Sequence, residues 1–536
     1  MSNRLLIAMV IAAAAADRGS AARSVQPESA LAARCRLATF GATVGGNFTT
    51  REANMVAAGS FAPVAALPGL GPFCRVQASV TAVPGSIVNF EVWIPEKWNG
   101  KLVATGTGGY GNVPTYRDMG AALLQGYAAT GGDTGHQTPT PDDLLWGAGH
   151  PERIEDWAGR SVHAGVGPAQ RIVELATGKR PSRSYYYGCS TGGHQGYTAM
   201  QQYPDDFDGV IAGAPGNNRV RLNAGFLWQF LANRQRGDNS TLILPAAKLP
   251  LITKAVVEAC DAGDGVADGV VDDPRTCRFD PAALQCKGAD DAGCLTSNQV
   301  AVVQRIYAGA KNPRTGEQIY PGWPRSSEAL TTGPNGAPAS GWQQYWGVAE
   351  PTRANFWRYW VFDDPKWDWW SFDFDRDMAR AADKVGKLID RTSPDLARFK
   401  ARGGKAIVYQ GWQDPVVNAL DTIAYAEKVR QQQKSAAETD SFYRLFLVPG
   451  MGHCSGGTGT TSFGNQGAAP PLVDADHDLL SAMDAWVERG KAPDRIIASR
   501  VVNGATVRTR PLCVYPKRAV FAGKGSTDDA ASFVCR

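Results

Sequence analysis

The sequence is 536 residues long, 43% hydrophobic and 20% charged, which is the composition of an ordinary globular protein rather than of a disordered or fibrous one. The formal net charge is only +4 and no run of like charges stands out, so nothing indicates a nucleic-acid or polyanionic partner. A chain of this length buries a large core and is expected to hold more than one structural unit.

The N-terminus has the pattern of an export signal. Arg4 precedes an apolar run over Leu5–Ala16, and small residues follow, including Ser20-Ala21-Ala22. We expect a signal peptide over residues 1–22. The run is too short to cross a membrane, and no later segment approaches the roughly 18 apolar residues of a membrane-spanning helix. We therefore expect a secreted or periplasmic protein without a membrane anchor; the alternative is a disordered tail on a cytosolic protein.

Strand and helix patterns alternate along the chain from residue 85. Strands are expected over residues 87–94, 101–104, 127–130, 184–187, 209–212, 405–409 and 445–448, and helices over 119–125, 169–177, 193–200, 420–431 and 479–489. Such alternation predicts a mainly parallel sheet with helices on both faces. The regularity stops over residues 216–400, a segment rich in tryptophan. We expect one α/β domain, formed by residues 23–215 and 401–536, with a large insertion.

The segment Gly188-Cys189-Ser190-Thr191-Gly192 fits the G-x-S-x-G pattern of a nucleophile elbow. It lies between an expected strand and an expected helix, and its glycines allow the sharp turn that joins them. The turn holds the serine hydroxyl at the N-terminus of the helix, where backbone N–H groups favour negative charge. We expect Ser190 to be a nucleophile.

A serine nucleophile needs a histidine base and an acid that orients it, and in α/β-hydrolases both follow the serine. His453, in a glycine-flanked loop after a strand, is the expected base. Asp414, on the loop after another strand, is the expected acid, although an aspartate before proline also forms turns. We expect His194 to pack or cap along the elbow helix and His477 to be solvated.

The ten cysteines favour disulfide bonds in an oxidising compartment, because no C-x-x-C zinc pattern is present. Sequence order suggests the pairs Cys35–Cys74, Cys260–Cys277, Cys286–Cys294 and Cys513–Cys535, which leaves Cys189 and Cys454. A bond between these two would tie Ser190 to His453. Sequence alone does not fix the pairing, and two unrelated buried cysteines are the alternative.

Two backbone N–H groups form an oxyanion hole. Thr191, which follows the nucleophile, is expected to supply one, and the glycine-rich loop over residues 106–109 the other. A loop of this kind can also bind phosphate, but the G-x-x-x-x-G-K-[ST] pattern is missing, so we reject a nucleotide site.

The segment Cys260–Asp272 carries several aspartates at short spacing, with glycines between them. Calcium accepts carboxylate and backbone carbonyl oxygens in loops of this kind, so a structural Ca²⁺ site is expected. The segment lacks the terminal glutamate and the flanking helices of an EF-hand, and an acidic surface loop is the alternative.

Together these motifs resemble the tannase and feruloyl esterase family. The resemblance rests on Cys189-Ser190, Asp414, His453-Cys454, the acidic loop and the cysteine spacing, and it spans nearly the whole mature chain. It implies an α/β-hydrolase fold with a large inserted lid domain over residues 216–400 that carries an aromatic substrate pocket. It also implies a serine esterase with Ser190 as nucleophile, His453 as base and Asp414 as acid.

The resemblance also implies which residues form the oxyanion hole and which bind calcium. The N–H groups of Gly109 and Thr191 would form the oxyanion hole, and Ca²⁺ would be held by Asp261, Asp264 and Asp268 with the carbonyl groups of Val266 and Val270.

Two positions depart from relatives in that family. Gln410 stands where feruloyl esterases often carry histidine. The arginine that binds the free carboxylate in a hydrolase of terephthalate monoesters aligns near Pro351, with Arg353 as a neighbour. We therefore expect aromatic carboxylic esters of the feruloyl (hydroxycinnamoyl) type as substrates, either small esters or esters on plant cell-wall polysaccharide. The alternatives are galloyl esters, terephthalate monoesters and noncatalytic ligand binding.

Overall fold

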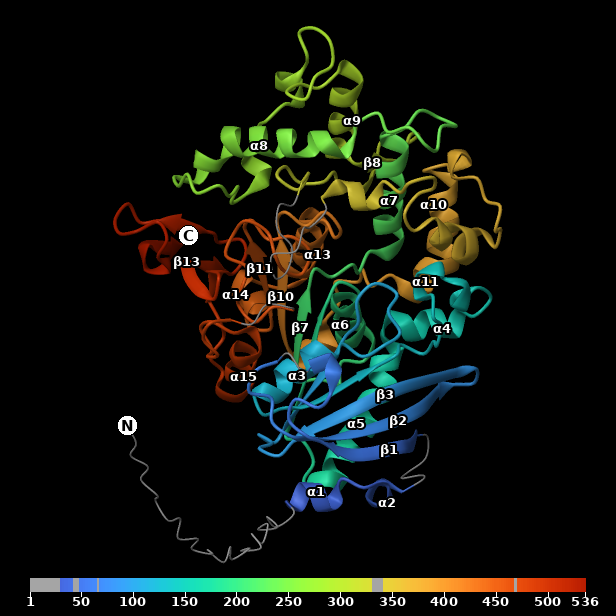
Figure 1. Cartoon of the computed structure of the whole chain (residues 1–536), viewed down its shortest axis with the longest axis vertical. Helices are drawn as coiled ribbons and strands as arrows, with labels where there is room; N and C mark the ends of the chain where they lie inside the picture. Colours follow the sequence, from blue (N-terminus) through green and yellow to red (C-terminus); the bar gives the residue numbers. More distant parts are fainter. Residues whose placement is uncertain (1–28, 42–47, 65–66, 330–340, 467–469) are drawn as a thin grey trace, which may run out of the picture.

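The computed structural model describes residues 29–41, 48–64, 67–329, 341–466 and 470–536 (Figure 1). The expected signal peptide over residues 1–22 lies outside these ranges. Within them, none of the helices combines the length and the apolar composition that crossing a bilayer requires.

A nine-stranded mixed sheet forms the centre of the molecule, in the order β1-β2-β3-β5-β4-β6-β7-β10-β11. Its strands are β1 (Phe48–Val56), β2 (Phe73–Val83), β3 (Ser86–Pro95), β4 (Lys101–Thr105), β5 (Ala128–Gly132), β6 (Arg183–Cys189), β7 (Gly209–Gly213), β10 (Lys405–Gly411) and β11 (Tyr443–Val448). The pairs from β1 to β5 are antiparallel and those from β5 to β11 are parallel. This is the sheet of an α/β-hydrolase fold, as expected. Strands β1 and β2 were not predicted from the sequence.

Helices cover both faces of the sheet, which is why its parallel strands are apolar on both sides. Neighbouring residues of a strand point to opposite faces and so belong to different cores. On one face, Leu102 and Tyr186 pack with α5 (Ser161–Thr177), α6 (Thr191–Gln202) and α13 (Ala419–Gln432). On the other face, Val103 and Tyr185 pack with α3 (Tyr116–Leu124) and α15 (Leu479–Arg489). Helix α5 begins eight residues before its expected start and contains Pro168. It follows a kink at Gly159, whose φ is 137°.

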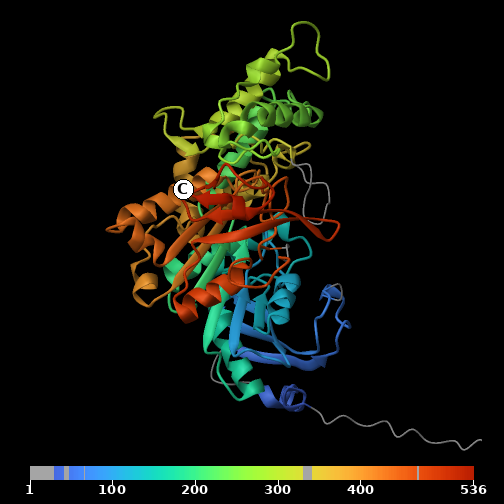
Figure 2. The ribbon, with the colours of Figure 1, turned by 90° about the vertical axis from the view of Figure 1, so that its left-hand side faces the viewer.

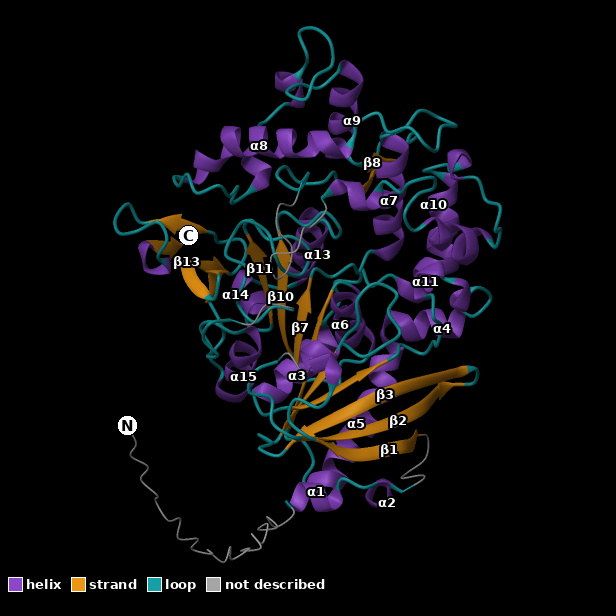
Figure 3. Cartoon of the chain, viewed as in Figure 1, coloured by secondary structure: helices purple, strands orange, loops and turns teal. Residues whose placement is uncertain are grey.

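The remaining helices are shorter or lie in the insertion. They are α1 (Ala30–Arg34), α2 (Leu37–Phe40), α4 (Pro151–Glu155), α7 (Arg219–Ala232), α8 (Leu249–Cys260), α9 (Ser297–Ala308), α10 (Arg376–Ala381), α11 (Lys387–Ile389), α12 (Ala397–Ala401) and α14 (Ala436–Asp440). Figures 1 and 2 show that α7, α8 and α9 gather beyond the carboxyl ends of β7 and β10. The described residues of the insertion are mostly helix and loop, and there β8 (Ala310–Lys311) pairs with β9 (Gln318–Tyr320) (Figure 3).

The tryptophans of the insertion mainly build its own core. Trp342, Trp346, Trp357, Trp360 and Trp367 are all buried. Trp357 and Trp360 belong to a hydrophobic cluster that includes residues 144–158 of the α/β domain, so the insertion is packed onto that domain. Trp369 and Trp370 both donate their indole N–H groups to Asn239.

Two short strand pairs end the chain. Strands β12 (Arg495–Val502) and β13 (Ala505–Cys513) form a hairpin beside β11, and β14 (Ala519–Phe521) pairs with β15 (Phe533–Cys535). Disulfide bonds join Cys35 to Cys74, Cys189 to Cys454, Cys260 to Cys277, Cys286 to Cys294, and Cys513 to Cys535. These are the five pairs suggested by sequence order.

Candidate active site

Ser190 occupies a sharp turn between β6 and α6. Its φ of 62° and ψ of −119° lie in a region that costs a non-glycine residue about 1–3 kcal/mol, and such strain is concentrated at functional sites. Neighbouring contacts hold the turn: the Ser190 N–H donates to the carbonyl of Gly213 over 2.9 Å. A Cβ atom at Gly193 would lie 2.2 Å from that same carbonyl oxygen, so only glycine fits there. The turn therefore has the strained geometry of a nucleophile elbow.

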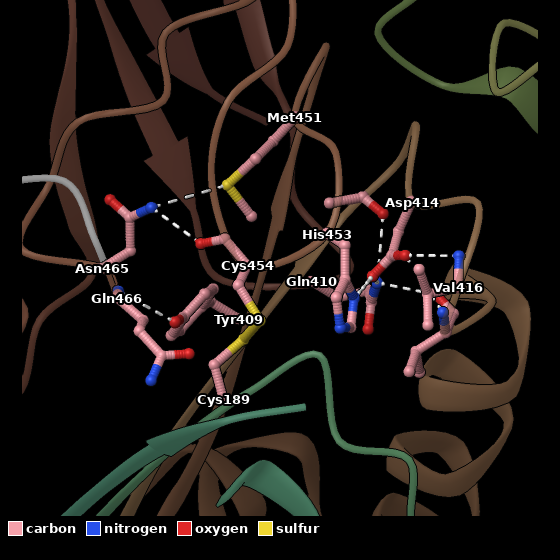
Figure 4. Close-up of a disulfide and its surroundings, with 12 residues drawn as sticks. Cys189, Tyr409, Gln410, Asp414, Val416, Met451, His453, Cys454, Asn465 and Gln466 are labelled. Carbon is pink, nitrogen blue, oxygen red and sulfur yellow. Dashed lines mark hydrogen bonds and ion pairs between the residues drawn. A yellow bond between two sulfur atoms is a disulfide. The ribbon is translucent and has the colours of Figure 1, made fainter. Parts of the chain in front are cut away.

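Asp414 and His453 meet at the carboxyl ends of β10 and β11 (Figure 4). The Nδ1 atom of His453 lies 2.8 Å from Oδ2 of Asp414, whose side chain is completely buried, whereas the imidazole is 24% exposed. The Oδ1 atom of Asp414 accepts the N–H groups of Val416 and Val417. An ionised carboxylate only accepts hydrogen bonds, so Nδ1 carries the proton and Nε2 is left free to act as a base.

Gln410 binds the second carboxylate oxygen of Asp414, which is not the one bound by the backbone donors. Its side-chain N–H group donates to Oδ2 of Asp414 over 3.0 Å and to the carbonyl of Val417 over 3.0 Å. Its own oxygen accepts the hydroxyl of Thr422. The glutamine is wholly buried, so at this position it orients Asp414 and does not reach solvent.

The disulfide between Cys189 and Cys454 joins the two halves of the candidate site (Figure 4). The Cα atoms of the two cysteines are 5.9 Å apart although they are 265 residues apart in sequence. Cys189 directly precedes Ser190, and Cys454 directly follows His453. The candidate nucleophile and the candidate base are therefore each next in sequence to one end of the same disulfide bond. Both cysteines are buried, which protects the bond from solvent.

The glycine-rich loop after β4 lies directly against the elbow helix. The hydroxyl of Thr191 donates to the carbonyl of Gly109 over 2.7 Å, and the indole N–H of Trp157 donates to the same oxygen over 3.0 Å. A Cβ atom at Gly106 would lie 2.5 Å from the Cα atom of Gly192, which shows how closely the two segments approach. The two residues expected to form an oxyanion hole are thus in contact, and the Gly109 carbonyl is held by two donors.

A buried arginine lies beside these residues. Arg219, the first residue of α7, is 7% exposed, donates to the hydroxyl of Thr191 over 3.2 Å and stacks over the ring of Trp157. Its Nε–H has no partner and no carboxylate forms an ion pair with it in the described part of the chain, so burial lowers the pKa of the guanidinium. The group nevertheless stays cationic, because arginine does not lose its proton in proteins.

Arg353 brings a second guanidinium to the same place. It lies over the ring of Tyr110 and forms a 3.2 Å ion pair with Asp142, which is largely exposed. Its Nη2 atom is 3.9 Å from the position of a Cβ atom at Gly109. Each of the two candidate oxyanion-hole residues therefore has an arginine next to it. The position of Arg219 was not predicted from sequence, because its burial depends on how the insertion packs.

The other histidines serve packing or surface roles. His194 is completely buried on α6, its Nε2 donates to the carbonyl of Ile389, and burial holds its pKa well below the ordinary value. His477 is partly exposed and pairs with Asp474. His136 is buried and stacks on Trp146, and burial lowers its pKa to about 4. His453 differs from all three, because its Nδ1 pairs with a completely buried carboxylate.

The acidic loop follows α8 and is closed by the Cys260–Cys277 disulfide. Asp261 accepts the backbone N–H groups of Asp268, Gly269 and Val270, which folds the loop around its carboxylate. Burial raises the pKa of Asp268, although Arg508 and Arg510 of β13 pair with this carboxylate.

Asp264 and Asp272 face each other across the same loop. Burial, together with the charge of Asp264, raises the pKa of Asp272 well above its usual value. Two carboxylates that repel each other in a partly buried loop favour a divalent cation held by a set of oxygen ligands. Asp272, which was not among the expected ligands, adds a carboxylate to that set.

Comparison with known proteins gives one family. The sequence profile described as "Tannase and feruloyl esterase" matches residues 74–536. An uncharacterized esterase of Xanthomonas campestris pv. campestris is 41% identical over 521 residues, which cover 91% of this chain and 88% of that protein. A probable feruloyl esterase B-1 of Aspergillus flavus is 33% identical over 468 residues and 86% of each chain.

A solved structure has the same fold. The crystal structure of feruloyl esterase B from Aspergillus oryzae superposes with a TM-score of 0.84 at 29% sequence identity, covering 94% of this chain and all of the other.

Proposed function

Because the chain belongs to the tannase and feruloyl esterase family, we propose that Ser190, His453 and Asp414 are the catalytic triad of this carboxylic ester hydrolase. The protein is an ester hydrolase of the feruloyl esterase and tannase type. One observation carries this assignment of residues: the Cys189–Cys454 bridge joins two parts of the site. At one end of the bridge His453 is hydrogen-bonded to Asp414, and at the other end Ser190 lies in a strained turn.

The first half of the reaction acylates the serine. His453 Nε2 takes the hydroxyl proton of Ser190 while the serine oxygen attacks the ester carbonyl carbon, and Asp414 stabilises the imidazolium that forms. The carbonyl oxygen becomes an oxyanion, which accepts hydrogen bonds from the N–H groups of Thr191 and Gly109. The tetrahedral intermediate then collapses, the bond to the alcohol oxygen breaks, and His453 returns the proton to the departing alcohol.

The second half releases the acid. His453 takes a proton from a water molecule, whose oxygen attacks the acyl carbon of the ester to Ser190. Collapse of the second tetrahedral intermediate breaks the bond to the serine oxygen, and the proton on His453 passes to it. The products are the carboxylic acid and free enzyme.

Covalent labelling tests this assignment directly. A fluorophosphonate should react with Ser190, and peptide mass spectrometry should locate the adduct there. A noncatalytic binder of aromatic ligands, which is the alternative from another class, would not react. Labelling at a different serine would contradict the assignment, and Ser481, which lies on α15, provides an internal comparison.

Aromatic esters of the hydroxycinnamoyl type are the proposed substrates, either as small molecules or attached to plant cell-wall polysaccharide. The aromatic side chains around the site support this choice: Tyr110 stacks on Trp157, and Tyr345 stacks on Phe226 with ring centroids 3.9 Å apart. The guanidinium groups of Arg219 and Arg353 favour an acyl group with oxygen atoms on its ring, which also suits galloyl esters and terephthalate monoesters. Rates on methyl ferulate, methyl gallate and a terephthalate monoester would rank the three.

A structural calcium ion is proposed for the acidic loop. Asp261, Asp264 and Asp268 and the carbonyl groups of Val266 and Val270 would hold it, with Asp272 as a further carboxylate. When bound, Ca²⁺ supplies positive charge that offsets the repulsion between these carboxylates. The loop itself belongs to the insertion and contacts β13 through Arg508 and Arg510.

The insertion over residues 216–400 is proposed to be a lid domain, since it contributes Arg219 and Arg353 to the surroundings of Thr191 and Gly109. A secreted or periplasmic location is also proposed. Five disulfide bonds support it, because such bonds persist in oxidising compartments.

A further inference from the structure

A cavity of about 210 Å³ borders the start of the loop that carries Asp414, at Trp412. Its walls come from residues 274–278 after the acidic loop, residues 322–325 after β9, Trp412 after β10, Tyr307 of α9 and Leu420 of α13. It is separate from Ser190, His453, Thr191 and Gly109, which do not line it.

The lining is rich in positive charge. Arg275, Arg278 and Arg325 all contribute to it, and no carboxylate does. Arg275 is paired with Asp273 by two hydrogen bonds, and Arg325 donates through Nε to the carbonyl of Phe279. Arg278 and Arg325 have no ion-pair partner among the residues that the structure describes. The cavity therefore has two guanidinium groups whose charge is not offset by a nearby ion pair.

Two carboxylates that contact lining residues are already engaged. Asp273 is held by Arg275, and the buried carboxylate of Glu328 accepts the hydroxyl groups of Tyr307 and Thr253. Neither carboxylate is free to neutralise Arg278 or Arg325. A ligand with a negative charge would supply the missing partner.

Aromatic rings form the rest of the wall. Trp323 and Trp412 are both buried. The guanidinium of Arg325 lies over the ring of Tyr307, 4.7 Å from its centroid, which is within the roughly 6 Å of a cation–π contact. Arg275 stacks over Trp412. Flat rings beside guanidinium groups suit a planar anion, because a guanidinium binds a carboxylate through two parallel hydrogen bonds and an indole stacks on an aromatic ring. The volume admits one small aromatic acid and not a polysaccharide chain.

The cavity contacts the catalytic acid loop at two points. Trp412 lies two residues before Asp414, and the indole N–H of Trp323 donates to the carbonyl of Pro415, the residue after Asp414, over 2.8 Å. A ligand packed against both tryptophans would therefore contact residues that flank Asp414, the acid that orients His453, on both sides in sequence.

We propose that this cavity is a second binding site, for a small aromatic carboxylate, and that its occupancy lowers turnover through the Asp414 loop. The ligand class includes the acid that ester hydrolysis releases, and this link to the reaction rests on the proposed function. The site would then make the enzyme sensitive to its own product at a position outside the catalytic centre.

Binding is tested with the catalytic centre blocked. The enzyme is labelled at Ser190 with phenylmethanesulfonyl fluoride, and sodium ferulate and sodium benzoate are titrated in by calorimetry. One mole of either acid per mole of labelled enzyme is expected to bind, and the neutral ferulic acid amide is expected not to bind. Failure of the label to attach would count against the proposed function alone, whereas no binding to fully labelled enzyme would overturn the second site.

Substitution then locates the site. Arg278→Gln removes a charge that has no partner to lose, so the fold should be preserved, and it is expected to raise the Kd of ferulate by at least about tenfold, the effect typical of losing one charge-assisted hydrogen bond. Arg325→Gln should act in the same direction. Arg236→Gln changes an exposed arginine of the insertion outside the cavity and serves as the matched control. Equal affinity in all four proteins would overturn the assignment.

Kinetics tests the coupling to turnover. In the unmodified enzyme, ferulate is expected to lower kcat for methyl ferulate as well as to raise KM. Arg278→Gln should abolish the effect on kcat and keep the effect on KM, because product still competes at the catalytic centre. Purely competitive inhibition of the unmodified enzyme would contradict the coupling.

Discussion

The imidazole of His453 donates through Nδ1 to Oδ2 of Asp414 over 2.8 Å, and the same carboxylate accepts three further hydrogen bonds, from Gln410, Val416 and Val417. Four donors on one buried carboxylate fix its orientation, and through it the orientation and tautomer of the ring. The base is therefore positioned before any substrate arrives, which is what a serine hydrolase requires.

Replacing the acid should remove activity without unfolding the protein. Asp414→Asn keeps the shape of the side chain but no longer favours the tautomer with its proton on Nδ1, and kcat is expected to fall by about 10³–10⁴-fold. Asp474→Asn is the matched control, because Asp474 pairs in the same way with His477 at the surface. Steady-state rates on methyl ferulate check both. A kcat that Asp414→Asn leaves within a few-fold would show that Asp414 is not the acid.

Removal of the disulfide at the site should affect both activity and stability. In the double variant Cys189→Ala and Cys454→Ala, loss of a cross-link across 265 residues would lower the free energy of unfolding by up to about 5 kcal/mol by loop-closure entropy. We also expect kcat to fall by at least about tenfold, because small errors in the placement of a base are costly.

The Cys286–Cys294 bond provides the comparison for that experiment. It closes only eight residues within the insertion, so replacing both of its cysteines by alanine should leave kcat unchanged. Thermal unfolding and kcat are measured for both double variants. Equal activity in the two would contradict a role for the Cys189–Cys454 bond in positioning the base.

Arg219 is expected to contribute to catalysis rather than to stability. Arg219→Met removes a buried cation that has no ion pair, so the melting temperature should stay the same or rise. The rate constant kcat should fall by about tenfold, because the guanidinium donates to Thr191 and its charge favours the nearby oxyanion. Arg219→Lys restores the charge and should recover part of kcat. A lower melting temperature with unchanged kcat would indicate a purely structural role.

Asp118 should make stability depend on pH. Burial raises its pKa to about 6 from 3.8, so between these values the folded protein binds a proton that the unfolded chain has lost. Stability contributed by this group is therefore lost as pH rises from about 4 to 6. Asp118→Asn, which keeps an acceptor for Gln466, should raise the melting temperature at pH 7.5 and not at pH 3.5. The same shift at both values would contradict this account.

Chelation tests the calcium site. Treatment with excess chelator is expected to lower the melting temperature, and added CaCl₂ should restore it, because a ligand that binds only the folded state stabilises that state. Asp264→Asn should make the melting temperature insensitive to the chelator. Its comparison is Asp290→Asn, in the insertion but outside the loop. A melting temperature that the chelator leaves unchanged in the unmodified protein would rule out a structural ion.

Local patterns predicted the parts of the site that depend on local structure. Ser190 sits in a turn that only its glycine neighbours allow, and Asp414 and His453 follow strands whose apolar residues are recognisable. The order of the cysteines led to the correct five pairs, because four of them are close in sequence. Helix α15 was predicted to the residue, since its apolar face and its terminal Gly490 are both clear signals.

Features that depend on distant contacts were missed. Helix α5 was expected to start after Pro168, but its first turns are stabilised by packing on β2 and β3, so the proline is tolerated inside. The partly exposed strand β1 has an irregular pattern of burial and gave no clear period. No local pattern distinguishes Arg219 from Arg278. The packing of the insertion buries Arg219 and places Arg278 in a cavity wall.

Hydrolysis of methyl ferulate by Ser190→Ala is the most direct test of the whole account. If the serine oxygen forms the acyl-enzyme, kcat should fall by at least about 10³-fold, with a melting temperature close to that of the unmodified protein. Turnover equal to that of the unmodified enzyme would show that another group carries out the reaction.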